Sequence, residues 1–211
     1  MIIREADVHD ARTMANLHAS IFPGFFLSSL GEDFLVTYYK SALQYQDTIC
    51  YFAENNGEIC GYVLGRAKAK GYLKKVVLSA PLRFIWQGIK LIFTRPKALI
   101  RLVNNLEKKS DDLLFVDNQD YAEIGLIGVL PQYKSQGIGR ALFNHFLDEL
   151  NKRGVKRVSL TTDALNNDST LRAYKSWGFT ILYEFISFPD RRMYRMIKKI
   201  DSLLQTKNLD S

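Results

Sequence analysis

Cysteine, histidine and proline are scarce in this chain of 211 residues, which contains two cysteines, three histidines and five prolines. The histidines (His9, His18 and His145) and the cysteines (Cys50 and Cys60) are scattered without metal-ligand spacing, so the sequence predicts no metal site. Both cysteines fall on strand-like runs joined by Asn56 and Gly57. A two-residue turn there would pair Cys60 with Ala53 and Cys50 with Val63, on opposite faces of a hairpin. That geometry excludes a disulfide.

Long apolar runs are also missing. The best candidate, "FIWQGIKLIF", has ten residues and is interrupted by Gln87 and Lys90, whereas a membrane-spanning helix needs about 20 apolar residues. The first residues, "MIIREADVHD", turn acidic at once and lack the pattern of a signal peptide. The sequence therefore predicts a cytoplasmic protein.

Positive charge is concentrated in one segment. Residues 67–110 contain eleven Lys or Arg and a single acid, Glu107, whereas the whole chain has a net charge of +7, so the remainder is slightly acidic. Because the basic character belongs to one segment, the chain is not expected to bind nucleic acid.

The hydrophobic pattern predicts alternating strands and helices. A first strand, "MIIREAD", is followed by a helix capped by Asp7 and a second helix over Ser28–Leu43. The hairpin, a basic helical insertion at about 67–120 and the apolar strand "YAEIGLIGVL" come next. A helix from Gln136 to Arg153, the strand "KRVSLTT", the helix "NDSTLRAYKSW" and two final strands complete the order. This order predicts an α/β fold with a mixed central sheet flanked by helices, in one domain over 1–200, with a tail over 201–211.

A glycine-bearing loop, "KSQGIG", joins the apolar strand to the helix after it. Free N–H groups and the helix dipole make such a junction suitable for a phosphate, and glycine lets the backbone approach closely. The nucleotide P-loop is excluded because Gly139 is followed by Arg140 and Ala141, and the dinucleotide fingerprint is excluded because Leu142 stands where a small residue is needed. From these residues alone, a simple tight turn is an equally good interpretation.

The wider stretch "IGVLPQYKSQGIGRAL" resembles the acetyl-CoA signature of the GNAT superfamily of N-acetyltransferases. A second stretch, "NDSTLRAYKSWGF", resembles a later motif of the family, with Asn167, Tyr174 and the pair Gly178-Phe179 at the matching places. The resemblance covers residues 121–180, and it implies a GNAT-like sheet. The residues that match the signature are Gly128, Val129, Pro131, Lys134, Gly137, Ile138, Gly139 and Leu142.

The resemblance implies acetyl-CoA as co-substrate and a set of residues for it. The backbone of Ile127, Gly128 and Val129 would hold the pantetheine and polarise the thioester, with Asn167 bonding the same arm. The pyrophosphate would lie against a loop made of Lys134, Ser135, Gln136, Gly137, Ile138, Gly139 and Arg140.

Two residues are candidates for proton transfer. Tyr174 would protonate the leaving thiolate, or else anchor its helix as a buried aromatic side chain. Glu123, on the apolar strand, would be the general base, or else a solvated glutamate at the strand end, with a water chain as base.

The acceptor and the role of the basic segment stay open. The favoured acceptor is a small primary amine, such as an anionic, nucleotide-linked amino sugar. The alternatives are a protein or peptide amine, or a non-catalytic module that only binds acetyl-CoA. The segment 67–110 is expected to be a structural insertion with a solvated basic face, a lid over an anionic acceptor, or a peripheral membrane contact.

Overall fold

The computed structural model describes residues 1–100, 117–187 and 190–200. Its centre is a seven-stranded sheet with the strand order β1-β2-β3-β4-β5-β7-β6. All neighbouring strands are antiparallel except β4 and β5, which run parallel. The mixed α/β sheet expected from the sequence is therefore confirmed. The strands are β1 Ile2–Glu5, β2 Thr48–Asn55, β3 Glu58–Arg66, β4 Ala122–Val129, β5 Arg157–Asp163, β6 Thr180–Ser187 and β7 Arg191–Lys199.

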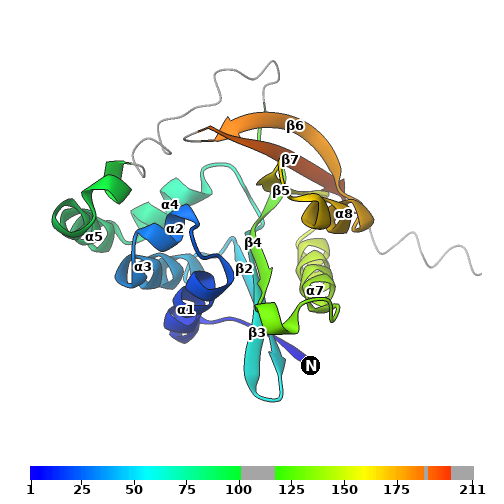
Figure 1. Ribbon diagram of the computed structural model, residues 1–211, viewed down its shortest axis with the longest axis horizontal. Coiled ribbons are helices and arrows are strands. Elements are labelled where there is room, and N and C mark those ends of the chain that lie inside the picture. Colours follow the sequence, from blue (N-terminus) through cyan, green and yellow to red (C-terminus); the bar gives the residue numbers. More distant parts are fainter. Residues whose placement is uncertain (101–116, 188–189, 201–211) are drawn as a thin grey trace, which may run out of the picture.

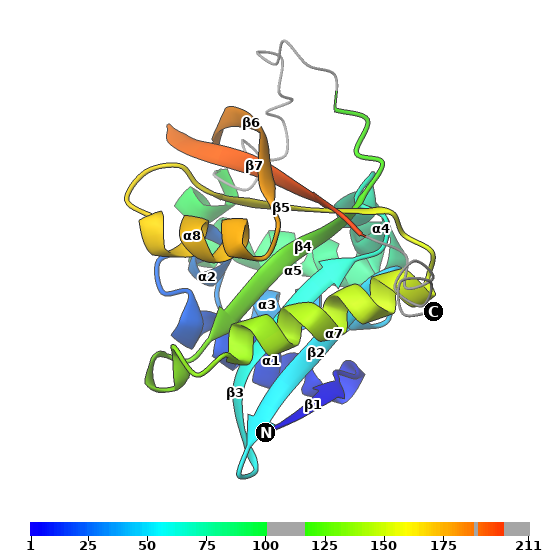
Figure 2. The ribbon, with the colours of Figure 1, turned by 90° about the vertical axis from the view of Figure 1, so that its right-hand side faces the viewer.

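Helices cover both faces of this sheet (Figure 1). One face carries η1 and the helices α1, α2, α3, α4 and α5, and the apolar residues of these five α-helices form one core cluster with the sheet. Figure 2 shows α7 crossing the opposite face, where it forms a second cluster. The helices are η1 Val8–Asp10, α1 Ala11–Ile21, α2 Phe26–Ser29, α3 Glu32–Leu43, α4 Tyr72–Ser79, α5 Pro81–Thr94, η2 Pro131–Tyr133, α7 Ile138–Lys152 and α8 Asp168–Ser176.

Several expected boundaries are corrected by backbone geometry. The helix expected over Ser28–Leu43 is divided, because Gly31 adopts φ +89° between α2 and α3. The helix after the glycine loop begins at Ile138 rather than Gln136, because Gly137 is left-handed with φ +76°. The tail over 201–211 and residues 101–116 of the basic insertion lie outside the described residues.

The β2–β3 hairpin has the expected turn but a shifted register. Asn56 and Gly57 both have positive φ, as a two-residue hairpin turn requires. Beyond them a bulge makes Ala53 oppose Gly61, and it places Cys50 opposite Leu64 instead of Val63. The two cysteines still belong to opposite core clusters, and both thiols are free and buried.

Candidate functional site

The candidate site starts where β4 separates from β5. Strand β4 pairs with β3 as far as Val129, but it pairs with β5 only over Ala122–Ile124. The rest of β5, Thr161–Asp163, has no partner in β4 and pairs only with β7 on its other edge, so the two parallel strands diverge (Figure 2). Gly125 is an extra residue in β4, since Leu64 opposes Leu126 and Gly65 opposes Ile124. The bulge at Gly125 thus coincides with the end of β4–β5 pairing.

The divergence leaves backbone donors of β4 at an open edge. Antiparallel pairs alternate between hydrogen-bonded and non-hydrogen-bonded positions. The Leu130 N–H donates to the Cys60 carbonyl at 2.8 Å, and by this alternation Gly128 also bonds to β3. The N–H groups of Ile127 and Val129 therefore point away from β3, toward the side where β5 has left the strand. This edge offers donors to an extended ligand.

The start of α7 supplies a second set of donors beside this edge. Gly137 is the N-cap residue and provides no side-chain cap. The hydrogen bond that begins α7 joins the Ala141 N–H to the Gly137 carbonyl at 3.0 Å. Within the part of the chain that the structure describes, the N–H groups of Ile138, Gly139 and Arg140 have no protein acceptor. Three free donors at the positive end of a 15-residue helix make an anion-binding site.

The two glycines of this loop, Gly137 and Gly139, occupy their positions for different physical reasons. Gly137 needs its left-handed φ, and Ser135 shares that conformation with φ +63°. Gly139 is an ordinary helical residue, and a Cβ there would come no closer than 3.7 Å to the Trp177 ring. The protein interior therefore does not require glycine at 139, whereas a ligand lying against the backbone would. Lys134 and Arg140 add positive charge, and the Arg140 guanidinium also donates to the Ser176 carbonyl at 3.2 Å.

Asn167 fixes the junction between β5 and α8. It stands at the N-cap position of α8, but its side chain does not cap that helix. Instead its Nδ2 donates to Thr162 Oγ1 at 2.6 Å and to the Asp163 carbonyl at 3.1 Å. Both amide protons are used within the protein, so the Oδ1 atom is the group left to accept a bond from a ligand.

Tyr174 lies on α8 with its ring against Trp177 and Phe179, at centroid distances of 5.5 and 6.0 Å. Burial raises the pKa of its hydroxyl to about 12, so the phenol keeps its proton at neutral pH. Among the described residues this hydroxyl has no hydrogen-bond partner. The side chain is thus both an aromatic anchor for α8 and a protonated donor.

Glu123 is not the solvated strand-end glutamate that was one of the expectations. Glu123 is 7% exposed, and its carboxylate forms ion pairs with the guanidinium groups of Arg66 and Arg195. The Arg195 pair has an N–O distance of 2.6 Å. Because both carboxylate oxygens already accept bonds from cations, Glu123 is poorly suited to take a proton directly from an amine.

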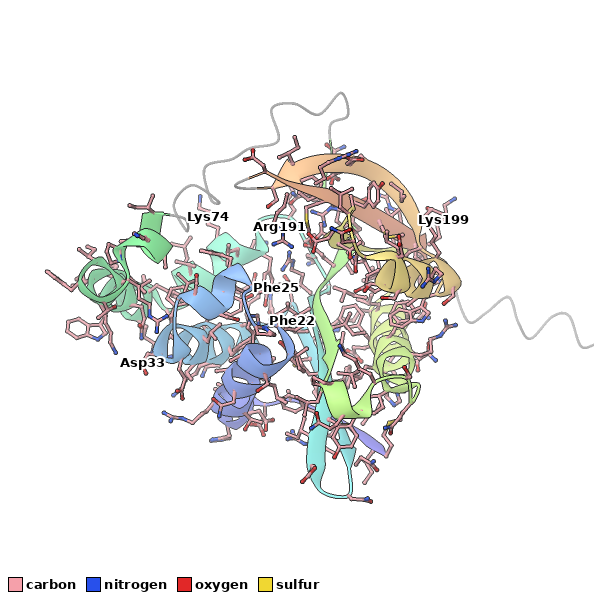
Figure 3. The ribbon with its side chains drawn as sticks, in the orientation of Figure 1. Phe22, Phe25, Asp33, Lys74, Arg191 and Lys199 are labelled. Atoms are coloured by element: carbon pink, nitrogen blue, oxygen red, sulfur yellow. The ribbon has the colours of Figure 1, made fainter. Side chains whose placement is uncertain are left out.

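A further group of side chains, absent from the sequence-based candidates, lies near the C-terminal end of α1. The rings of Phe22 and Phe25 are 5.0 Å apart, and the Arg191 guanidinium lies 5.7 Å from the Phe25 ring (Figure 3). Arg191 also pairs with Asp163 at the end of β5 at 2.7 Å. On β4, Gly128 makes room for this group, since a Cβ there would lie 2.8 Å from the Phe22 ring. This packing explains Gly128 without reference to a ligand.

The spacing of Arg191 and Arg195 in the sequence could have indicated that they share one face of a strand. Arg191 and Arg195 are four residues apart in the strand-like run "RRMYRMIKK", and even spacing on a strand places side chains on one face. Arg191 contacts the Phe25 ring, whereas Arg195 contacts Glu123 of β4 and the Tyr121 ring. As for metals, the described residues contain no group of three or more His, Cys, Asp or Glu side chains that could hold an ion.

Comparison with protein families gives a match over most of the chain. The profile described as Acetyltransferase (GNAT) family matches residues 12–179. Two curated relatives are the [Ribosomal protein bS18]-alanine N-acetyltransferases of Escherichia coli K12 and Salmonella typhimurium LT2. The first is 45% identical over 60 residues, which is 28% of this chain and 40% of that protein. The second is 36% identical over 80 residues, or 36% and 53% of the two chains. The matches thus span about half or less of those relatives.

Solved structures resemble the whole fold. The ribosomal-protein-S18-alanine N-acetyltransferase from Escherichia coli has a TM-score of 0.59 and 18% identity, covering 95% of this chain and 94% of that one. Ard1 from Thermoplasma volcanium has a TM-score of 0.58 and 15% identity, covering 95% and 97%. At these identities the likeness is one of fold.

Proposed function

Because this chain belongs to the GNAT family of acetyltransferases and is therefore an acyl-CoA-dependent N-acetyltransferase, we propose that it transfers an acetyl group from acetyl-CoA to the α-amino group of a protein or peptide. The observation that carries the proposal is the pairing of two donor sets, namely the open edge of β4 and the three free N–H groups that begin α7. An extended pantetheine along β4 and a pyrophosphate at α7 need donors in this order.

The cofactor residues have distinct tasks in this proposal. The N–H groups of Ile138, Gly139 and Arg140 bind the pyrophosphate, and the side chains of Lys134 and Arg140 neutralise its charge. Ser135, Gln136 and Gly137 shape the loop that leads into the helix. The N–H groups of Ile127 and Val129 hold the pantetheine and polarise the thioester carbonyl, with Gly128 between them. Asn167 accepts a bond from the same arm through Oδ1.

Tyr174 supplies the proton that the leaving thiolate needs. A phenol with a pKa near 12 is almost fully protonated at pH 7, so the group is in the form that a general acid requires. The amine acceptor must lose a proton in the same reaction. Glu123 fits this role only through a bridging water, because its own oxygens are engaged by Arg66 and Arg195.

The relatives support a protein acceptor. Those that match are named for acetylating the alanine of ribosomal protein bS18, which favours an α-amino group over the amino sugar that we expected from the sequence. The cytoplasmic location and the absence of a nucleic-acid partner stay predictions.

One observation keeps a small anionic amine as the second candidate. The Arg66 and Arg195 guanidiniums share a single carboxylate, and the Nε atoms of both are buried without a partner among the described residues. These two Nε–H groups are donors that lack an acceptor within the described part of the chain, which suits a phosphate or carboxylate on the acceptor molecule.

Thiol release from acetyl-CoA tests the proposal. The purified protein is offered an alanine-initiated peptide, the same peptide with its N-terminus already acetylated, and a panel of nucleotide-linked amino sugars. We expect turnover with the free peptide, a mass increase on its α-amine, and none with the blocked peptide. Turnover with amino sugars alone would transfer the assignment to the second candidate, and no turnover with any amine would contradict both.

A further inference from the structure

Large apolar side chains are exposed along α5. Phe93 is 83% exposed, Leu82 80% and Trp86 66%, whereas such residues are usually scattered singly on the surface of a folded protein. The neighbouring helix α4 adds Leu73 and Leu78. This feature is separate from the acetyl-CoA residues, and the inference drawn from it does not depend on the reaction proposed above.

The exposed face belongs to a helix that is already fixed on its other side. Leu91 is 3% exposed, the Phe84 ring meets the Phe34 ring at 6.2 Å, and the Gln87 side chain donates to Thr37 Oγ1 at 3.0 Å. Lys90 forms an ion pair with Asp33 of α3, which Figure 3 labels beside this helix. Helix α5 is therefore docked on α3 by one face, and its outer face is a defined surface of the folded chain.

The outer face of α5 is a continuous apolar stripe. At about 100° of rotation per residue, its six exposed apolar side chains fall within an arc of about 120°. Arg83 and Lys90 are seven residues apart and follow one edge of that arc. The stripe consists of Leu82, Ile85, Trp86, Ile89, Ile92 and Phe93.

Positive charge lies along one edge of the stripe and on the neighbouring helix. Lys74 and Lys75 are exposed on α4, and Arg83 is exposed at the start of α5. The stretch of sequence that contains α4 and α5, residues 67–110, has eleven basic residues and one acidic residue. An apolar face bordered by cations matches a surface that has an apolar interior and an anionic rim.

We propose that this face docks on the surface of an anionic lipid bilayer, with the α5 stripe buried at the level of the headgroups. A second copy of the chain is disfavoured as the occupant, because its own basic segment would face this one. No single described helix is long and apolar enough to cross a membrane, and α4 and α5 meet that test only as a pair bent by 95°. A helix of 14 residues is about 21 Å long, which suits an amphipathic helix lying in the interface plane.

Vesicle binding tests the docking. The full chain is sedimented with phosphatidylcholine vesicles that contain or lack phosphatidylglycerol. We expect binding only to the vesicles with phosphatidylglycerol, and we expect it to weaken as salt is raised. Replacing both exposed aromatics, Trp86→Ser with Phe93→Ser, should lower the partition coefficient roughly 100-fold, because two buried aromatic side chains are lost.

A charge-reversal variant and two control variants distinguish docking through this face from nonspecific adsorption to vesicles. Lys74→Glu with Lys75→Glu should lower the partition coefficient at least about 25-fold, at roughly fivefold for each basic residue lost. The control Lys156→Glu with Lys199→Glu removes two exposed lysines outside the segment, and Figure 3 shows Lys199 on the opposite side of the molecule from Lys74. This control, and the apolar control Leu165→Ser, should bind like the wild type.

Three results would overturn the proposal. One is the absence of binding to phosphatidylglycerol vesicles, and another is binding that the aromatic double variant leaves unchanged. The third is a concentration-dependent dimer, measured by analytical ultracentrifugation without lipid and abolished by Trp86→Ser with Phe93→Ser, which would assign the stripe to a second copy. Acetyl-CoA affinity measured on the same variants should equal that of the wild type, since α4 and α5 contribute none of the donors of that site.

Discussion

Gly139 occupies the first turn of α7, where an added methyl group would find ordinary contacts inside the protein. Gly139→Ala should therefore raise the free energy of unfolding by about 0.5–1 kcal/mol, through better helix propensity. The same methyl group would stand between the backbone and the pyrophosphate, so acetyl-CoA affinity should fall about tenfold or more. Urea unfolding and calorimetry measure the two effects.

The matched control for this substitution is Gly88→Ala in α5, where a Cβ would meet nothing within 4 Å. It should raise stability similarly without changing acetyl-CoA affinity. If Gly139→Ala binds acetyl-CoA like the wild type, the N-terminus of α7 does not hold the pyrophosphate.

Tyr174→Phe removes one hydroxyl and keeps the ring that packs on Trp177 and Phe179. Loss of a general acid typically costs about 10²–10⁴-fold, so kcat should fall by this factor while acetyl-CoA affinity is retained. Because burial raises the pKa of Tyr174 to about 12, the pH profile of kcat should show no phenol titration near pH 10. Tyr51→Phe, on the far strand β2, is the control, and equal turnover of both variants would leave Tyr174 a structural residue.

His18 makes folding sensitive to acid. Its side chain is fully buried, its Nδ1 lies 2.6 Å from the Tyr39 hydroxyl, and its Nε2 has no partner among the described residues. Burial lowers the pKa of His18 to about 4, whereas in the unfolded chain it is about 6.5. Below about pH 6.5 the unfolded state takes up a proton on His18 that the folded state excludes. The contribution of His18 to the free energy of unfolding is therefore fully present above about pH 6.5, and it is lost as the pH falls toward 4.

The expected slope is about 1.4 kcal/mol per pH unit within that window, measured as the free energy of urea unfolding. His18→Leu should be less stable at neutral pH, because Tyr39 loses its partner, but its slope between pH 6.5 and 4 should be smaller. Asp10 contributes in a different range, since its ion pair with Arg4 lowers its pKa below 3.8. An unchanged slope in His18→Leu would show that other groups carry the pH dependence.

At the scale of elements, α1 approaches β4 only because Gly128 has no side chain. A Cβ there would lie 2.5 Å from Ile21 and 2.8 Å from the Phe22 ring. Gly128→Ala should therefore lower the free energy of unfolding by about 1–3 kcal/mol, the usual cost of overpacking. Gly125→Ala on the same strand is the control, because its nearest contact would be 3.5 Å. Equal stability of the two variants in urea would contradict this account of the α1–β4 contact.

The elements around the glycine loop were predictable because their signals are local. Helices α7 and α8 each have consistent periodicity and a glycine near a boundary, and strand β4 is a largely apolar run. The exact start of α7 was not predictable from periodicity, because Gln136 and Ser135 fit a helix equally well, and only the left-handed backbone of Ser135 and Gly137 excludes them.

The ion-pair cluster around Glu123 could not be predicted in the same way. Arg66, Glu123 and Arg195 come from β3, β4 and β7, and their meeting depends on three strand registers. Three of the ladders of these strands contain bulges, at Cys60 in the hairpin, at Gly125 in β4 and at Leu182 in β6. One extra residue moves every later side chain by one position. The same effect displaced Cys50 by one partner from its expected place.

At the scale of the whole molecule, the sheet separates two apolar layers, and each layer contains one thiol. Cys50 lies in the layer of α1 and α3, and Cys60 in the layer of α7. Both residues are at most 3% exposed, and burial raises the pKa of each thiol. A thiol that is buried and protonated reacts slowly with disulfide reagents, so the native protein should show almost no labelling by Ellman's reagent.

Labelling during unfolding then reports on how the two layers are coupled. Both layers share strands β2 and β3, and α7 packs on the same strands whose other face carries α1 and α3. We therefore expect Cys50 and Cys60 to become reactive together, at one urea midpoint that coincides with the loss of helical circular dichroism. The variant Cys50→Ala reports on Cys60 alone, and Cys60→Ala reports on Cys50 alone. In each variant, the urea midpoint of labelling is compared with the midpoint of the circular dichroism transition of the same variant. Reaction of Cys60 at clearly lower urea than the circular dichroism transition would show that the α7 layer, which carries the proposed pyrophosphate site, opens before the layer that carries the apolar stripe.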